Sequence, residues 1–514
     1  MRSKRIVATA AALALALGLS ACGGSTSTGG SATAGKDGVL SAGTLTLAAL
    51  ADNNSFDRAA LEIGHKTQYW MPVFDTLLVL DPQSVPQPGL ATKWSYNADN
   101  TVLSLTLREG VKFTDGAPFD GKAVAANLDY LKNGGGQNAY MAKSVKTVDV
   151  VDATHANLVL SAPDPGLLGY LGVVGGAMAS PASLTAADKA TNPVGSGPYV
   201  LDKAKTVAGS QFVYERNADY WDLKSFPYEK LIIKPMTDVT ARINALKSGQ
   251  VNGAVIDSKS AAEAKSSGLQ VETTQVDWTG LFLADREGKV VPALGDVRVR
   301  QAINYLFDSP ALLKGISLGQ GEVTNQVFGK SSQAYVPALD NYYSHDEAKA
   351  KKLMADAGYA DGFTVTMPDS PGFATVNPIL EQTLLKLNIK TEWVKVAPDA
   401  LGGQILAGKF PMFVFNLGSQ SAWQDIQKVA LPTSPWNTAK VNSAELNALI
   451  EKAQFATGSE QDTAMQAVNT WLVKNAWFAP FYRMSSPYAT DAKTKVVLQS
   501  QNAAPWIRSY SPAP

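Results

Sequence analysis

The sequence has one cysteine, three histidines and no excess of either charge, and each shortage excludes a class of protein. A single cysteine cannot form a disulfide within the chain. Three scattered histidines do not predict a histidine-based zinc site. The 45 lysines and arginines equal the 45 aspartates and glutamates, so the basic excess of a general nucleic-acid binder is missing. We therefore expect no nucleic-acid partner, no metal and no cofactor.

Long apolar runs are also scarce, and the exception lies at the start of the chain. Arg2, Lys4 and Arg5 precede an apolar stretch over residues 6–19. That stretch is shorter than the roughly 20 residues of an ordinary membrane-spanning helix and has the length of a signal-peptide core. No later stretch reaches the roughly 18 apolar residues that spanning requires. The pattern predicts a signal peptide over residues 1–21.

The only cysteine, Cys22, directly follows Leu19, Ser20 and Ala21. This order resembles the lipobox of bacterial lipoproteins, in which the cysteine is diacylated and becomes the first mature residue. The resemblance implies lipidation of Cys22 and anchoring on the outer face of the cell membrane. The alternative is a free surface thiol after a signal peptide. Residues 22–38, rich in Gly, Ser and Thr, are expected to form a flexible tether, and the mature chain would carry a net charge of −3.

The body of the chain alternates strand and helix patterns and is long enough for about three domains. Leu103, Leu105 and Leu107 alternate with polar residues, which predicts a strand with one buried face. Asp296 is placed to cap a helix, and residues 344–347 resemble a capping box for another helix. The expected fold class is mixed α/β.

Catalytic motifs are not found. Residues 403–410 match a phosphate-binding loop except at Phe410, where Ser or Thr would hold Mg²⁺, and a helix end followed by a strand explains them better. No Gly-x-Ser-x-Gly motif is present. Paired carboxylates for glycoside hydrolysis leave no signature in a single sequence. We predict a protein that is not an enzyme.

Several blocks occur in a fixed order along the chain. They read Gly-Leu-Ala-Thr-Lys-Trp at 89–94, Leu-Thr-Leu-Arg-Glu-Gly-Val-Lys-Phe-Thr-Asp-Gly at 105–116, Pro-Val-Gly-Ser-Gly-Pro-Tyr at 193–199, Glu-Arg-Asn-Ala-Asp-Tyr-Trp at 215–221, Asp-Val-Arg-Val-Arg-Gln-Ala-Ile-Asn-Tyr at 296–305, and Ala-Lys through Ala-Gly-Tyr at 348–359. This series resembles the extracellular solute-binding proteins of family 5, which include dipeptide, oligopeptide and nickel binders of ABC importers.

The resemblance implies a two-lobed clamshell of the periplasmic-binding-protein type II, with an extra subdomain inserted in the first lobe. Its expected limits are 39–82, 192–272 and 480–514 for the first lobe, 83–191 for the inserted subdomain and 273–479 for the second lobe. The resemblance also implies a monomer that binds a peptide or other small solute and delivers it to an ABC permease with its ATPase.

Family members hold the ligand between an early loop, the crossover strand and a Trp-bearing loop of the second lobe. Carried over to this sequence, the resemblance implies ligand contacts by Asn54, Phe56, Trp278, Asn416, Trp423 and Asp425. Peptide binders of the family carry an Asp-Tyr-x-Asp-Pro run after the Trp, and this chain lacks it. Asp425 is the candidate partner for an ammonium group. An oligosaccharide or another non-peptide solute stays an alternative, and a secreted hydrolase or a sensor on the same fold are further ones.

Overall fold

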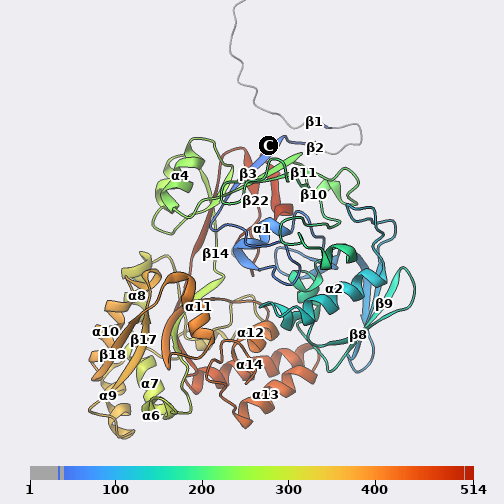
Figure 1. The fold of residues 1–514 in the computed structure, drawn as a ribbon. Coiled ribbons are helices and arrows are strands. Elements are labelled where there is room, and N and C mark those ends of the chain that lie inside the picture. The colour runs from blue at the N-terminus through green and yellow to red at the C-terminus, as the bar shows by residue number, and fades with distance from the viewer. Residues whose placement is uncertain (1–32, 35–39, 503) are drawn as a thin grey trace, which may run out of the picture.

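The computed structural model describes residues 33–34, 40–502 and 504–514. The predicted signal peptide, Cys22 and most of the predicted tether lie outside these residues. A seven-stranded sheet occupies the upper part of the molecule (Figure 1). A four-stranded sheet, built from strands between residues 277 and 484, forms the centre of the second lobe. Within the described residues, no helix is both long and apolar enough to cross a membrane.

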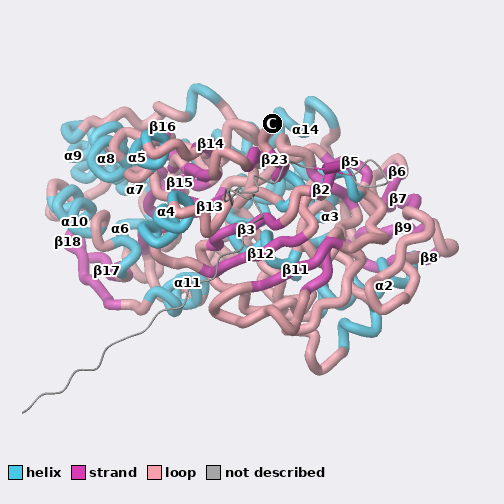
Figure 2. The backbone as a smooth tube through the Cα atoms, turned by 90° about the horizontal axis from the view of Figure 1, so that it is seen from above, coloured by secondary structure: helices cyan, strands magenta, loops and turns pink. Residues whose placement is uncertain are grey.

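The upper sheet has the strand order β10-β11-β12-β3-β13-β21-β14. Its central strand β3 pairs in parallel with β12 and β13, and these strands lie side by side when the molecule is seen from above (Figure 2). The bounds are β3 Thr44–Ala49, β10 Tyr199–Leu201, β11 Phe212–Arg216, β12 Lys230–Pro235, β13 Gly253–Val255, β14 Gln270–Thr274 and β21 Ser486–Thr490.

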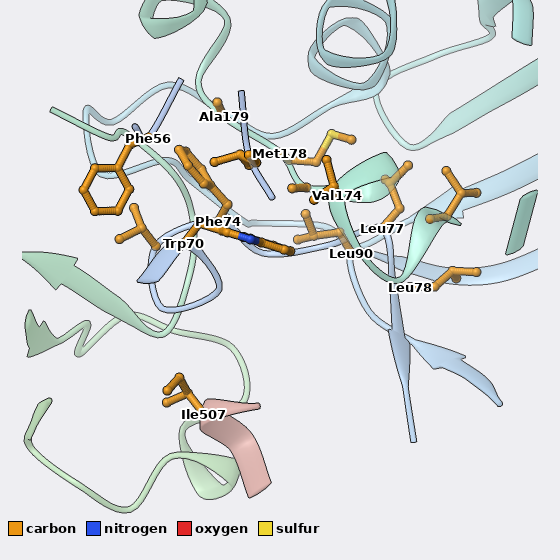
Figure 3. Close-up of a cluster of buried hydrophobic side chains, with 14 of the residues drawn as sticks. Phe56, Trp70, Phe74, Leu77, Leu78, Leu90, Val174, Met178, Ala179 and Ile507 are labelled. Atoms are coloured by element: carbon orange, nitrogen blue, oxygen red, sulfur yellow. The ribbon is translucent and has the colours of Figure 1, made fainter. Parts of the chain in front are cut away.

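Alternate residues of β3 enter different cores, because successive side chains of a strand face opposite sides. Leu45 and Leu47 join a large apolar core on one face. Ala48 packs on the other face with α4 (Val239–Lys247) and α5 (Ala261–Ser266). Figure 3 shows part of the large core, where Phe56 lies near Trp70 and Phe74.

A four-stranded antiparallel sheet, β6-β7-β9-β8, extends the first lobe. Its strands are β6 Ala91–Tyr96, β7 Val102–Leu107, β8 Val145–Val150 and β9 His155–Leu160, and α2 (Gly121–Asn133) packs against it (Figure 1). Leu103, Leu105 and Leu107 are buried as the alternation predicts. They belong to the same core as Leu45, so this subdomain and the upper sheet are packed as one body.

The second-lobe sheet has the order β16-β20-β15-β19. Its bounds are β15 Asp277–Leu283, β16 Gly321–Val323, β19 Met412–Gly418 and β20 Phe478–Met484. One face packs on α11 Pro398–Leu406, α12 Ala422–Val429, α13 Ala444–Phe455 and α14 Gly458–Lys474. The other packs on α7 Val297–Leu306, α8 Ser309–Ser317, α9 Glu347–Asp356, α10 Asn377–Leu385 and the parallel pair β17 Phe363–Asp369 and β18 Ile389–Lys395.

The chain passes between the two sheets at two neighbouring places. It leaves the upper sheet after β14 and enters the second-lobe sheet with β15, and it returns from β20 to β21. Because β14 pairs with β21 and β15 pairs with β20, the two crossing segments run side by side. This pair of connections is the covalent link between the two sheets. The exact domain limits stay predictions.

Of the two predicted helix caps, one is confirmed and the other is wrong. Asp296 caps α7 as predicted, accepting a hydrogen bond from Arg298 N at 2.8 Å. The predicted capping box at 344–347 is wrong, because Asp346 caps α9 and accepts from Lys349 N at 2.8 Å. A carboxylate two positions later in the chain competes successfully with the Ser344 hydroxyl for the helix N-terminus.

Candidate ligand-binding cleft

A cavity of about 410 Å³ lies where the two lobes and the crossing segments meet. This volume is within the range of small-molecule sites. The first lobe contributes residues 62–65 and 501–502, and its subdomain contributes residues 137, 138 and 140. The crossing segment supplies Val276 and Asp277, and the second lobe supplies residues 406, 417–420, 428, 435 and 436. A solute in this cavity would touch both lobes.

The first-lobe wall is a loop that hydrogen bonds hold from several sides. Gly64 N donates to Asn502 Oδ1 at 3.1 Å, and Asn138 Nδ2 donates to Leu61 O at 2.9 Å. Glu62 pairs with Lys66 at 2.6 Å. Gly64 has a φ of +78°, which favours glycine. The loop therefore presents its side chains to the cavity from a fixed backbone.

His65 is part of this wall, and its Nδ1 is buried without a hydrogen-bond partner in the described residues. Burial, and then the positive charge of Arg242, lower the pKa of His65 below its usual value. The imidazole is consequently neutral at pH 7 and can offer a nitrogen lone pair to a ligand.

Asp277 opens β15 at the crossing point and lines the cavity. It pairs with Gly418 of β19, and a Cβ on that glycine would lie 3.1 Å from Asp277 Oδ1. The glycine leaves room for the carboxylate. Burial raises the pKa of Asp277, and the charge of Lys428 opposes this in part.

Lys428 and Asp425 form an ion pair within α12 at 2.7 Å. Asp425 also accepts from Gln420 N at 3.0 and 3.1 Å, and Lys428 donates to Gly418 O. Burial raises the pKa of Asp425, against the stabilising charge of Lys428. The carboxylate of Asp425 is thus occupied by neighbours of its own lobe.

The structure places Phe56 and Trp278 in apolar cores. Phe56 packs edge-on against Phe212, with ring centroids 6.1 Å apart. Trp278 is 1% exposed and stacks on Phe282 at 5.1 Å. Neither residue is among those that line the cavity.

Three other predicted contacts, Asn54, Asn416 and Trp423, also lie outside the cavity wall. Asn54 is exposed, and Asn416 accepts a hydrogen bond from Thr279 Oγ1 at 2.8 Å. Trp423 is 3% exposed and lies against the subdomain of the first lobe, where a Cβ on Gly166 would come 3.0 Å from its ring. None of the three lines the cavity. Cys22 lies outside the described residues.

None of the residues that line the cavity was predicted as a ligand contact from the sequence, and those with aromatic or ionisable side chains include His65, Tyr140, Asp277, Lys428 and Trp436. Asp277 could have been predicted from the sequence, because it directly precedes Trp278 and successive residues of a strand face opposite sides. His65 has no distinctive sequence neighbours, so only the fold could identify it.

A second cavity, of about 40 Å³, lies inside the first lobe beside Asp75 and is too small for a solute. Trp221 Nε1 donates to Asp75 Oδ2 at 2.6 Å. Burial raises the pKa of Asp75 to about 6 despite this hydrogen bond and the nearby charge of Arg508. Among the described residues, no group of three or more His, Cys, Asp and Glu could hold a metal ion.

One family of proteins and several individual relatives match this sequence. Residues 85–436 match the family described as bacterial extracellular solute-binding proteins, family 5 Middle. The glutathione-binding protein GsiB of Salmonella typhimurium is 29% identical over 332 residues, covering 62% of this chain and 62% of that protein. GsiB of Escherichia coli O157:H7 is 27% identical over 334 residues, covering 62% and 63%. The match thus spans about 62% of the length of these relatives.

Solved structures extend the likeness to most of the chain. AgaA of A. tumefaciens R10, in complex with agropinic acid, gives a TM-score of 0.80 at 21% identity and covers 92% of this chain and 99% of that one. DppA of Helicobacter pylori, with the peptide STSA, gives 0.79 at 20% identity and covers 91% and 98%. NikZ of Campylobacter jejuni, with Ni(L-His), gives 0.76 at 19% identity and covers 91% and 99%. At these identities the likeness concerns the fold.

Proposed function

Because the chain belongs to the bacterial extracellular solute-binding proteins of family 5, we propose that it is the substrate-binding protein of an ABC importer. Its fold is the mixed α/β, two-lobed clamshell of type II periplasmic binding proteins. In this proposal the protein captures a small solute between its lobes, closes, and delivers the solute to a membrane permease that an ATPase drives.

The observation that carries the proposal is the cavity of about 410 Å³ with walls from both lobes and from the crossing segment. A solute that bridges the two walls gains contacts only when the lobes approach, so it shifts the population towards the closed form. The lobes touch in this structure: Gln454 Nε2 donates to Pro163 O at 2.8 Å, and Tyr170 donates to Gln427. These contacts would add to the stability of the closed form.

The proposed ligand is a peptide or a related small solute. GsiB is named for glutathione, and DppA was solved with a peptide. AgaA and NikZ, with agropinic acid and Ni(L-His), indicate how widely the ligand varies on this fold. Tyr140 and Trp436 give the cavity of this chain aromatic surface, which keeps an oligosaccharide as the second candidate.

Transport rather than catalysis is the proposed activity. A secreted hydrolase on the same scaffold would convert its ligand, whereas a receptor returns it unchanged. Incubating the purified protein with peptide and glycoside substrates distinguishes the two: turnover that scales with protein concentration would refute the receptor.

The proposed location is the outer face of the cell membrane, where a lipid on Cys22 anchors a monomer. The order Leu19-Ser20-Ala21-Cys22 supports this proposal. Conversion of Cys22 to Ser should move the protein from the membrane fraction to the soluble fraction or the medium. Continued retention in the membrane fraction would refute the anchor.

Native mass spectrometry of the purified mature protein is the direct test of solute binding. A bound solute should appear as a defined mass increment that disappears on denaturation. A thermal-shift screen of peptide and oligosaccharide pools should then identify its class, since a ligand at a hundred times its Kd adds about 2.7 kcal/mol of stability. Oligosaccharides that raise the melting temperature while no peptide pool does so would replace the peptide assignment.

A further inference from the structure

The charged side chains of the cavity wall differ in whether another residue of the protein neutralises them. Glu62, Asp277 and Lys428 line it, and no arginine is among the described residues that do so. The question for a ligand is which of the three charges still lacks a partner within the protein, since a charge in a buried site needs a counter-ion.

Two of the three are already neutralised. The carboxylate of Glu62 lies 2.6 Å from Lys66 Nζ. The ammonium of Lys428 lies 2.7 Å from Asp425 and also donates to Gly418 O, and its side chain is only 13% exposed. An acidic ligand would therefore have to break the Lys428–Asp425 pair, which would leave Asp425 buried without a partner.

Asp277 is the remaining charge. Its carboxylate makes no hydrogen bond to the described residues, and the only cation that acts on it is Lys428, which Asp425 already holds. The missing side chain of Gly418 gives it space on one side, and the cavity lies on the other. With Glu62 and Lys428 each paired, Asp277 is the one charged-type side chain of the described cavity wall that has no counter-ion of its own.

Two further polar atoms in the wall lack partners. Gln420 Oε1 and His65 Nδ1 are both buried without a partner in the part of the chain that the structure describes. The unsatisfied amide oxygen of Gln420 favours a ligand that supplies N–H groups. Trp436 adds a π-face that Phe415 and Phe282 hold in place, with ring centroids at 4.8 and 5.6 Å. Such a face attracts cations.

We propose that the cleft selects solutes that carry a cationic amine or amidine and no free carboxylate, with Asp277 as the counter-ion of the cation. This inference rests on the proposed solute-binding function and narrows its ligand class, because it excludes free peptides, whose C-terminus is a carboxylate. It also moves the ammonium partner from Asp425, which the resemblance favoured, to the crossing segment. A cation beside Asp277 offsets the burial cost that raises the pKa of this carboxylate.

The test uses ligands that share a body and differ in charge. Tri-alanine is compared as its C-terminal amide, as the free peptide, as the N-acetyl acid and as the N-acetyl amide. The glucosamine trimer and the N-acetylglucosamine trimer form a second pair with and without amines. Binding of each to the full mature protein is measured by isothermal titration calorimetry at pH 7.

In the wild type, the amide with a free amine should bind roughly ten- to a hundredfold more tightly than the N-acetyl amide, as for a charged hydrogen bond. Asp277→Asn should abolish this preference. The matched control is Glu272→Gln, which neutralises an exposed carboxylate on β14 and should keep it. Circular dichroism and the melting temperature without ligand check that the variants fold, and the wild-type comparison stands without them.

Several outcomes would overturn the inference while leaving the receptor function intact. These are binding of the free peptide or of the N-acetyl acid as tight as that of the amide with a free amine, a preference for amines that survives in Asp277→Asn, or a co-purified solute with a free carboxylate. If none of the six probes binds and no solute co-purifies, the inference and the proposed function fail together.

Discussion

Gly166 lies where the subdomain of the first lobe meets the second lobe, and its replacement by alanine should weaken closure. It precedes the short helix α3 (Leu167–Leu171). A Cβ at this position would come 2.9 Å from Tyr170 Cζ and 3.0 Å from Trp423 Cδ1. Both distances are too short for carbon atoms in van der Waals contact. The backbone φ of −86° suits alanine, so the expected effect is steric and not conformational.

The magnitude follows from the two rings that would have to move. Tyr170 donates a hydrogen bond to Gln427 of the second lobe, and Trp423 is 3% exposed in the second-lobe core. Overpacking of this kind costs about 1–3 kcal/mol. When the lobes separate, Trp423 leaves and Tyr170 is free to rotate, so most of the cost falls on the closed form. Apparent affinity for solute should then fall roughly 5- to 150-fold.

The assay combines calorimetry on the co-purified solute with small-angle scattering of the loaded protein. Gly166→Ala should raise the Kd and increase the radius of gyration at sub-saturating solute. Gly169→Ala is the matched control, because its Cβ would meet only the Gln424 side chain, with Nε2 at an ordinary 3.5 Å. A Kd for Gly166→Ala within twofold of the Gly169→Ala value would refute the link between this junction and closure.

Three further predictions concern stability and charge. Trp278→Ala should lower the free energy of unfolding by about 3–5 kcal/mol in urea titrations, because Trp278 is a core residue, and an unchanged midpoint would contradict that role. The pKa of Asp75 is raised from 3.8 to about 6 in the folded protein. The stability that the protonated carboxyl gives is complete below the unfolded pKa of 3.8, and roughly 3 kcal/mol of it is lost as the pH rises to about 6. Urea titrations from pH 4 to 7 should show this decline, and Asp75→Asn should flatten it. Asp425→Asn releases Lys428 from its partner, so the tri-alanine N-acetyl acid should gain affinity, and no gain would show that Lys428 stays unavailable.

Local sequence patterns predicted the elements of this fold more accurately than they predicted the ligand cavity. The alternation over residues 102–107 and the Asp296 cap depend on neighbouring residues, and both are present in the structure. The cap at Asp346 was missed because two adjacent groups could fill the same role. The cavity depends on segments hundreds of residues apart, such as 62–65 and 417–420, which only the folded chain brings together.

The resemblance selected residues close in sequence to several that line the cavity, but none of the selected side chains lines it. It selected Trp278, and the structure puts that ring in the second-lobe core while Asp277 lines the cavity. In a strand, one position is the difference between the two faces. In α12, Asp425 and Lys428 lie one turn apart, so the helix supplies its own counter-ion. Neither outcome is visible in residue identity alone.

The position of Asp277 gives its charge a role that Asp425 could not have. Asp425 belongs wholly to the second lobe, and its charge is balanced there whether the lobes are open or closed. Asp277 lies on the segment that joins the lobes, and the first-lobe wall with His65 faces the same cavity. As the lobes approach, they remove water from this carboxylate, and the cost of leaving it uncompensated rises. A cationic solute removes that cost mainly in the closed form, and a ligand shifts an equilibrium only by such a difference. Selection by charge and closure would thus depend on the same carboxylate.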